Sequence, residues 1–231
     1  MKEVIPGVFM MEGLLGANVY LLLSNKGAVL VDSGIRADAD KILAQVAQAG
    51  YSTSIKSILL THFHGDHAGG AAKLSKLWGA QVMAHKEDAP FITQPASIPA
   101  FSCFKQLVNW IGANVALRSS CKVDRLLEDG DRIDALDGSV IIHTPGHTAG
   151  SISLYQPERQ ILFCADAIFN QNPATQKPGM RLPLRLISVD NAQALQSVRK
   201  LASLPIKVIC FGHGEPVVEG AREQIERLLA Q

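Results

Sequence analysis

The sequence lacks the features that mark membrane-spanning and disulfide-rich secreted proteins. None of its apolar stretches reaches the roughly 18 residues that span a bilayer. Its four cysteines are widely separated and form no CxxC pair, which argues against a disulfide framework or a zinc knuckle. The N-terminal segment MKEVIPGVFMMEG lacks the cationic flank and long apolar core of a signal peptide. We therefore expect a cytoplasmic protein with no membrane partner and buried thiols, the alternative being an exported chain whose signal has been trimmed.

The charge pattern gives no reason to expect a nucleic-acid partner. The chain has 22 Lys and Arg against 21 Asp and Glu, for a formal net charge of +1. The basic residues form no run of five or more and no alternating basic and aromatic groove pattern. A surface that tracks phosphate groups is therefore not predicted.

Short apolar runs and helical patterns alternate along the chain, as is typical of an α/β protein. Segments 18–24 and 27–34 flank NKG and predict a hairpin. Further strands are predicted at 54–61, 80–85, 139–143, 151–155, 160–165 and 207–211. Helices are predicted at 37–49, 68–79, 191–203 and 218–230, the third opened by Asp190 as its cap. Because both faces of each sheet need cover, residues 1–231 should form one domain of two packed mixed sheets with helices outside.

Several polar residues crowd the end of the strand predicted at 54–61. The stretch THFHGDHAGG places His62, His64, Asp66 and His67 directly after that apolar run. Histidines two positions apart point to one side of an extended chain, and Gly65 then lets the chain turn. A lone histidine is usually a surface or core residue, but packing has no use for four adjacent polar groups. One short loop can thus present ligands to two metal ions.

Four more residues of ligand type follow apolar strands elsewhere in the chain. Asp32 follows AVLV, and His147 lies in HTPGHTAGS, whose Pro and Gly form a turn. Asp166 ends ILFCAD, and His213 follows KVICF. A common edge of the two sheets could bring these side chains together with the histidine stretch.

In this order the residues resemble those of the metallo-β-lactamase superfamily, over essentially the whole chain. The resemblance implies a four-layer αββα sandwich of the α/β class. It also implies two adjacent metal ions with one shared ligand: His62, His64 and His147 for one ion, Asp66, His67 and His213 for the other, and Asp166 as the bridge. Asp32 would hold the histidine loop, capping of the following turn being the alternative. Imidazole and carboxylate ligands without thiolate suit Zn²⁺, and Fe or Mn fits almost as well.

The same resemblance implies a hydrolase in which a hydroxide that bridges the ions attacks a carbonyl carbon. Asp66 would serve catalysis as a ligand, and a residual positive charge would favour an anionic transition state. We expect cleavage of an ester, thioester or lactone of a small molecule. The alternatives are a mononuclear-iron sulfur dioxygenase, a promiscuous hydrolase with weak β-lactamase or phosphodiesterase activity, and a binder without catalysis.

Differences from individual relatives narrow this expectation. True β-lactamases of this fold generally carry Cys or Ser where this chain has Asp166, so β-lactam hydrolysis is disfavoured as the main activity. Glyoxalase II relatives share the whole ligand set, but their long form adds a C-terminal helical domain for which too few residues follow His213. Acyl-homoserine lactonases tend to carry a tyrosine near the bridging aspartate, where this chain has Phe169. We therefore do not expect a long-form glyoxalase II, whereas a short thioesterase is not excluded.

Two segments are candidates for substrate binding. Residues 90–117 hold a single charge and many apolar side chains, including Phe104 and Trp110. They predict an apolar helical flap at about 86–120 beside the metals, with core packing or a homodimer face as alternatives. Residues 169–188 hold Lys177, Arg181 and Arg185 without an acid. This loop could bind a substrate carboxylate or phosphate, and a plain solvated loop is the alternative. The candidate substrate contacts are Phe169, Arg181, Arg185, Phe104 and Trp110.

Overall fold

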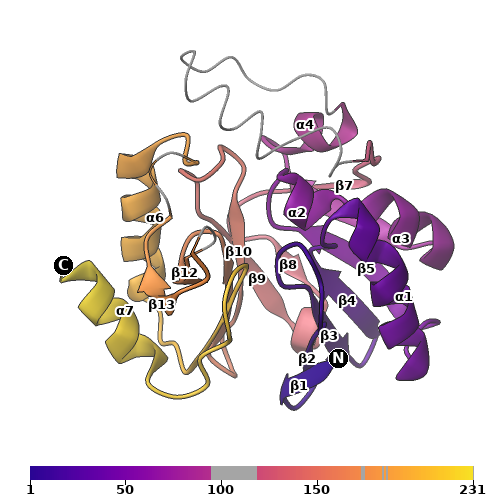
Figure 1. Cartoon of the computed structure of the whole chain (residues 1–231), viewed down its shortest axis with the longest axis horizontal. Helices are drawn as coiled ribbons and strands as arrows, with labels where there is room; N and C mark the ends of the chain where they lie inside the picture. Colours follow the sequence, from indigo (N-terminus) through magenta and orange to yellow (C-terminus); the bar gives the residue numbers. More distant parts are fainter. Residues whose placement is uncertain (95–118, 173–174, 184, 186, 231) are drawn as a thin grey trace.

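Two β-sheets lie face to face in the computed structural model, with helices on both outer sides (Figure 1). The structure describes residues 1–94, 119–172, 175–183, 185 and 187–230. Within these residues, every helix is too short or too polar to cross a membrane.

The first sheet contains seven strands in chain order, from β1 to β7. Its first half is antiparallel, and the pairs from β4 to β7 are parallel. This sheet is mixed, as predicted. Its strands are β1 (Lys2–Ile5), β2 (Val8–Met10), β3 (Tyr20–Ser24), β4 (Gly27–Val31), β5 (Ile55–Leu60), β6 (Gln81–His85) and β7 (Arg125–Leu127).

The second sheet has the strand order β14-β11-β10-β9-β8 and is also mixed. Only the β11–β14 pair is parallel. A separate hairpin pairs β12 with β13. The strands are β8 (Arg132–Ile133), β9 (Ser139–His143), β10 (Ile152–Gln156), β11 (Ile161–Ala165), β12 (Phe169–Gln171), β13 (Pro178–Arg181) and β14 (Val208–Phe211).

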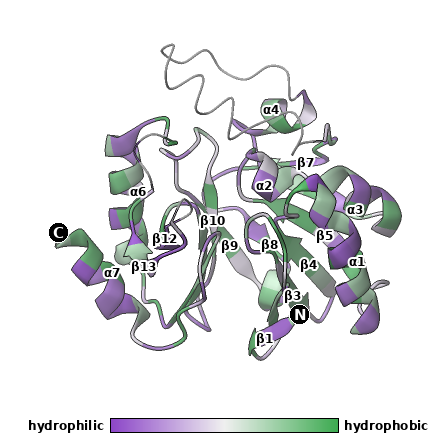
Figure 2. Ribbon diagram, in the orientation of Figure 1, coloured by the Kyte–Doolittle hydropathy of each residue, from purple (hydrophilic) through white to green (hydrophobic). Residues whose placement is uncertain are grey.

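Three apolar layers hold the sheets and helices together. α1 (Ala39–Gln48) and α3 (Ala71–Trp78) bury their apolar faces against the outer side of the first sheet. A second cluster fills the space between the sheets. α6 (Asn191–Ala202) and α7 (Ala221–Leu229) cover the second sheet through a third cluster. These layers confirm the four-layer αββα architecture, and Figure 2 shows green strands inside with purple faces on the outer helices.

The topology collects the loops that follow several strands at one edge of the sandwich. β4, β5 and β6 run parallel to one another, so their carboxyl ends lie together, and the same holds for β11 and β14. Backbone hydrogen bonds join the two sheets at this edge, from Ile152 N to Thr61 O (2.9 Å) and from Asn18 N to Gly212 O (2.8 Å). The loops that carry the candidate ligands therefore meet.

The longer elements lie within a few residues of their predicted positions, whereas short ones were missed. The helix predicted at 68–79 is observed as α3, and a short helix that was not predicted, α2 (Gly65–Ala68), precedes it. Strands β1, β2, β7, β8, β12 and β13 have two to four residues each, too few to show a period. Of the flap predicted at about 86–120, the structure shows α4 (Ala89–Thr93), and residues 95–118 lie outside the described part.

Asp190 caps α6, as the sequence predicts. Its Oδ1 accepts hydrogen bonds from Ala192 N (2.9 Å) and Gln193 N (3.0 Å). Asp190→Ala should lower the free energy of unfolding by about 1 kcal/mol, because two backbone donors lose their acceptor. Asp190→Ser should retain most of the stability. Urea unfolding followed by circular dichroism measures both variants, and equal midpoints for wild type and Asp190→Ala would contradict the capping role.

Candidate metal centre

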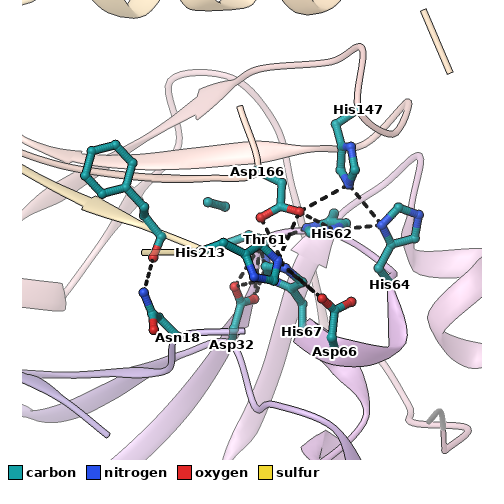
Figure 3. Close-up of polar contacts among 12 residues, drawn as sticks. Asn18, Asp32, Thr61, His62, His64, Asp66, His67, His147, Asp166 and His213 are labelled. Carbon is teal, nitrogen blue, oxygen red and sulfur yellow. Dashed lines mark hydrogen bonds and ion pairs between the residues drawn. The ribbon is translucent and has the colours of Figure 1, made fainter. Parts of the chain in front are cut away.

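Three imidazole nitrogens from two distant loops converge at one point (Figure 3). His64 Nδ1 lies 3.1 Å from His62 Nε2 and 2.9 Å from His147 Nε2. His62 and His64 follow β5, whereas His147 follows β9 and is 83 residues away from His64 in sequence. All three side chains are buried. We call these residues the three-histidine site.

A second cluster contains the remaining candidate ligands. His213 Nε2 lies 3.3 Å from Asp66 Oδ2, and His67 Nε2 lies 3.8 Å from the same oxygen. Asp66, His67 and His213 form a group whose ligand atoms all lie within 4.8 Å of one another. We call this group the Asp66 site. Asp66 is 28% exposed and His213 is 19% exposed, so solvent reaches the centre from this side.

Asp166 lies between the two sites. Its Oδ2 is 3.4 Å from His147 Nε2 and 3.6 Å from His213 Nε2, and its Oδ1 is 3.3 Å from His67 Nε2. The preceding residue, Ala165, has a left-handed φ of 46°, which turns the chain at the end of β11. Gly212 passes so close that a Cβ there would lie 2.3 Å from Asp166 Oδ1. The structure thus brings all seven predicted ligands together around one shared carboxylate.

Asp32 orients two of these histidines through a buried hydrogen-bond network. Its Oδ2 lies 2.7 Å from His67 Nδ1 and 2.8 Å from Thr61 Oγ1. A carboxylate can only accept, so the Thr61 hydroxyl donates to Asp32 and accepts from His62 Nδ1 at 3.2 Å. The Nε2 atoms of His62 and His67 are therefore the ones that face the site. The side-chain hydrogen bonds of Asp32 thus all go to residues of the histidine loop, as a role in holding that loop requires.

The segment that carries His213 is anchored by a residue that the sequence analysis missed. Asn18 Nδ2 donates to Gly214 O (2.7 Å) and Phe211 O (3.1 Å), one on each side of His213 in the sequence. Tyr20 Oη donates to the same Phe211 carbonyl at 2.9 Å. Neither residue lies in a recognisable motif, so only the fold reveals this contact. Thr61, by contrast, could have been suspected because it directly precedes His62.

The two sites differ in their proton affinity. Burial, followed by the neighbouring His147, lowers the pKa of His64 to about 3, and burial also lowers the pKa of His62 and of His147. In the Asp66 site, burial lowers the pKa of His213, but its contacts with Asp166 and Asp66 outweigh burial and raise it to about 9. The three-histidine site is neutral at pH 7, whereas the Asp66 site holds protons in the absence of a metal.

The donor set fits divalent cations. Among the residues that the structure describes, the buried site atoms His67 Nε2 and Asp166 Oδ1 have no hydrogen-bond partner. The same holds for His147 Nδ1, but the nitrogen of His147 that faces the site is Nε2. His67 Nε2 and Asp166 Oδ1 face each other at 3.3 Å without the alignment that a hydrogen bond requires. Zinc held at about 2.0–2.1 Å by tetrahedral ligands places those ligands about 3.3 Å apart, which is close to the separations here. A cation in each site would bind these ligand atoms and, in the Asp66 site, would replace the protons held there.

The five residues predicted to contact a substrate differ in their burial and in their neighbours. Phe169 is fully buried, with its ring centroid 5.2 Å from that of His213 and 6.3 Å from that of His147. Arg181 donates to the carbonyls of Lys177, Pro178 and Gly179 within its own hairpin. Arg185 has an exposed side chain beside the start of α6. Phe104 and Trp110 lie outside the described residues. Substrate contact by these five residues stays a prediction.

The remaining two histidines lie outside the ligand groups. His85 and His143 stack on each other with centroids 4.0 Å apart and planes inclined by 13°. Burial, followed by the neighbouring His143, lowers the pKa of His85 to about 4. The structure therefore places this pair of side chains against each other and outside the ligand groups.

Comparison with known families agrees with this geometry. Residues 13–213 match the family model described as the metallo-beta-lactamase superfamily. The chain belongs to the metallo-β-lactamase superfamily. A solved metallo-β-lactamase family protein of Thermus thermophilus superposes with a TM-score of 0.75 at 25% identity, covering 99% of this chain and 80% of that one. The B3 metallo-β-lactamase BLEG-1 superposes with a TM-score of 0.73 at 23% identity over 97% of both chains, which shows the shared fold alone.

Curated members of the superfamily are similar in sequence as well. The probable metallo-hydrolase YflN of Bacillus subtilis is 30% identical over 216 residues, which are 87% of this chain and 81% of that protein. A hydroxyacylglutathione hydrolase of Pseudomonas aeruginosa is 32% identical over 185 residues, or 79% of this chain. The match covers 54% of that hydrolase, so this chain spans about half of its length.

Metal binding should release protons at pH 7, because a cation displaces the protons that the Asp66 site holds. His213, with its pKa raised to about 9, is protonated at pH 7 in the metal-free protein, as is His67, whose pKa the three nearby carboxylates raise against the effect of burial. Zinc affinity at this site should therefore rise with pH towards 9. Titration of metal-free protein with Zn²⁺ in weak buffer and a pH indicator measures the release. A titration that frees no protons would contradict this charge assignment.

Proposed function

We propose that this metal-dependent hydrolase of the metallo-β-lactamase superfamily uses a dinuclear centre to cleave an ester, thioester or lactone of a small molecule. The observation that carries the proposal is the position of Asp166, whose two oxygens face ligand atoms of both sites. One buried carboxylate shared by two groups of ligands is suited to a pair of adjacent cations. Zinc is the preferred metal because the ligands are imidazoles and carboxylates, and Fe or Mn is the alternative.

The chemistry that two bound divalent ions supply is activation of water near neutral pH and polarisation of a carbonyl oxygen. The protein's part is to orient the ligand atoms and to exclude bulk water from one side. Hydrogen bonds at Nδ1 orient His62 and His67 so that Nε2 points inward. Burial of the three-histidine site leaves the partly exposed Asp66 and His213 as the side open to a substrate.

Asp66 is the candidate for catalysis because it is both a ligand and exposed to solvent. Burial raises its pKa, but the charge of His67 and the contact with His213 hold it well below the usual range. The carboxyl group is therefore ionised at neutral pH. Its position beside the exposed edge would let it orient water or a leaving group next to the ions.

Relatives favour a thioester or a related acyl compound as substrate. The Pseudomonas aeruginosa relative is named a hydroxyacylglutathione hydrolase, and the Bacillus subtilis relative a probable metallo-hydrolase. Because this chain matches only 54% of the first of these proteins, its own acyl and leaving groups form part of the proposal. The aspartate at 166 favours these substrates over β-lactams.

A substrate panel tests the proposed reaction. Protein with about two zinc ions per chain should hydrolyse thioesters, esters or lactones faster than phosphodiesters and β-lactams, and chelation should abolish turnover. Metal analysis and product detection are made on the same preparation. One iron per chain with oxygen consumption on a persulfide would instead identify a sulfur dioxygenase and refute the hydrolase.

Substitution of Asp66 tests its role as ligand and catalyst. Asp66→Ala should fold with wild-type secondary structure, and its turnover rate should fall by at least about 100-fold. The Asp66 site would then keep only two imidazoles and the carboxylate of Asp166, which it shares with the other site. Asp124→Asn is the matched control, since Asp124 is similarly exposed, at 31% against 28%, and contacts Lys122 and Val82 away from the centre. Wild-type rates for Asp66→Ala with metal-quantified protein would refute the assignment.

A further inference from the structure

A buried carboxylate outside the ligand set connects the loops of the three-histidine site. Asp88 lies three residues after β6, at the start of α4, and its side chain is fully buried. Its Oδ2 accepts from Phe63 N at 3.0 Å and from Thr148 Oγ1 at 2.7 Å. Its Oδ1 accepts from Gly150 N at 2.7 Å. The carboxylate thus receives donors from two loops that are far apart in sequence.

These donors are the immediate neighbours of the three histidines. Phe63 is the residue between His62 and His64, and Thr148 directly follows His147. The three nitrogens of the site come from these same two loops. His64 and His147 are thus each adjacent in sequence to a residue that donates a hydrogen bond to the Asp88 carboxylate.

The turn after His147 is shaped to approach Asp88. A Cβ on Gly150 would lie 2.5 Å from Asp88 N and 2.6 Å from Asp88 Oδ1, so any side chain at this position would push the turn away. Thr148 N donates to Ser151 Oγ at 3.0 Å, and the two hydroxyl oxygens are 2.7 Å apart. Because Asp88 can only accept, the Thr148 hydroxyl donates to it and accepts from Ser151.

Helix capping does not explain the position of this side chain. Asp88 precedes α4, but its carboxylate makes no capping hydrogen bond to that helix. Burying an anion is costly unless donors compensate it, and the three donors found here all belong to the ligand loops. Among the residues that the structure describes, these three hydrogen bonds of the Asp88 carboxylate join the ligand loops and none caps its own helix.

We propose that Asp88 is a positioning residue for the three-histidine site, which holds the loop of His62 and His64 and the turn of His147 at the separation that one cation requires. The inference rests on the metal centre proposed above. Asp88 contacts the histidine loop and the His147 turn. In the Asp66 site, by contrast, Asp32 holds His67 and Asn18 holds the segment that carries His213. Loss of Asp88 should therefore weaken one of two metal-binding steps.

Zinc titration resolves the two steps. Metal-free protein is titrated with Zn²⁺ in competition with a chromophoric chelator, which yields two dissociation constants. His147→Ala removes a ligand of the three-histidine site and identifies the step that belongs to it. In Asp88→Asn the dissociation constant of this step should rise by about 10–100-fold, as is typical when a partner of metal ligands is lost. The dissociation constant of the other step should stay within about twofold of the wild-type value.

A matched buried carboxylate provides the control. Asp38 is 2% exposed and accepts backbone hydrogen bonds from Leu15, Gly16 and Ile35, none of which belongs to the ligand loops of the three-histidine site. Asp38→Asn should leave the three-histidine constant unchanged. The visible spectrum of Co²⁺ bound at that step should change in Asp88→Asn and not in Asp38→Asn.

Several outcomes would overturn the inference. Wild-type constants for Asp88→Asn, or equal weakening of both steps, would remove the positioning role while leaving the dinuclear centre intact. Wild-type protein that binds no zinc would overturn the metal centre and this inference together. If Asp88→Asn does not fold, Thr148→Val removes only the hydroxyl donor. It should weaken the same step severalfold, and an unchanged constant would refute the proposal.

Discussion

The withdrawal of ionisable groups from water is the constraint on which this structure depends. His62, His67, His147 and Asp166 are almost completely buried at the edge where the two sheets meet. Such groups are tolerated only when other charges, hydrogen bonds or metal ions replace the lost water. The protein supplies part of this compensation through the carboxylates beside His67 and His213, which raise the pKa of both imidazoles. The lone pairs of the three-histidine site remain for a cation.

Three polar residues outside the ligand set fix the segments that carry the ligands. Asp32 binds Thr61 and His67, Asp88 binds the two loops of the three-histidine site, and Asn18 binds the carbonyls around His213. Each makes more than one hydrogen bond to a loop that the sheets alone would leave free to move. A site built from loop residues thereby acquires the rigidity of the strands behind it.

The two sites differ in solvent exposure, and this difference suggests the side from which a substrate would approach. The three-histidine site is enclosed, whereas Asp66 and His213 remain partly exposed. An acyl compound would approach the centre from the Asp66 side, where charged groups contact solvent. The buried Phe169 ring packs behind His213 and His147, so it supports these imidazoles from within the fold. In the proposed reaction, specificity for the acyl and leaving groups would depend on the loops around the exposed Asp66 and His213.

The sequence by itself determined the ligand types, their place after apolar strands and the layered α/β class, because local periodicity and residue chemistry suffice for these features. The histidine stretch after β5, the Asp190 cap and the long strands of the second sheet all follow from such local signals. Short edge strands carry too few residues to reveal a period. Only the tertiary structure decided which nitrogen of each histidine faces the centre and which residues, such as Asp88 and Asn18, hold the loops. Those contacts join segments distant along the chain, and their geometry is created when the two sheets pack together.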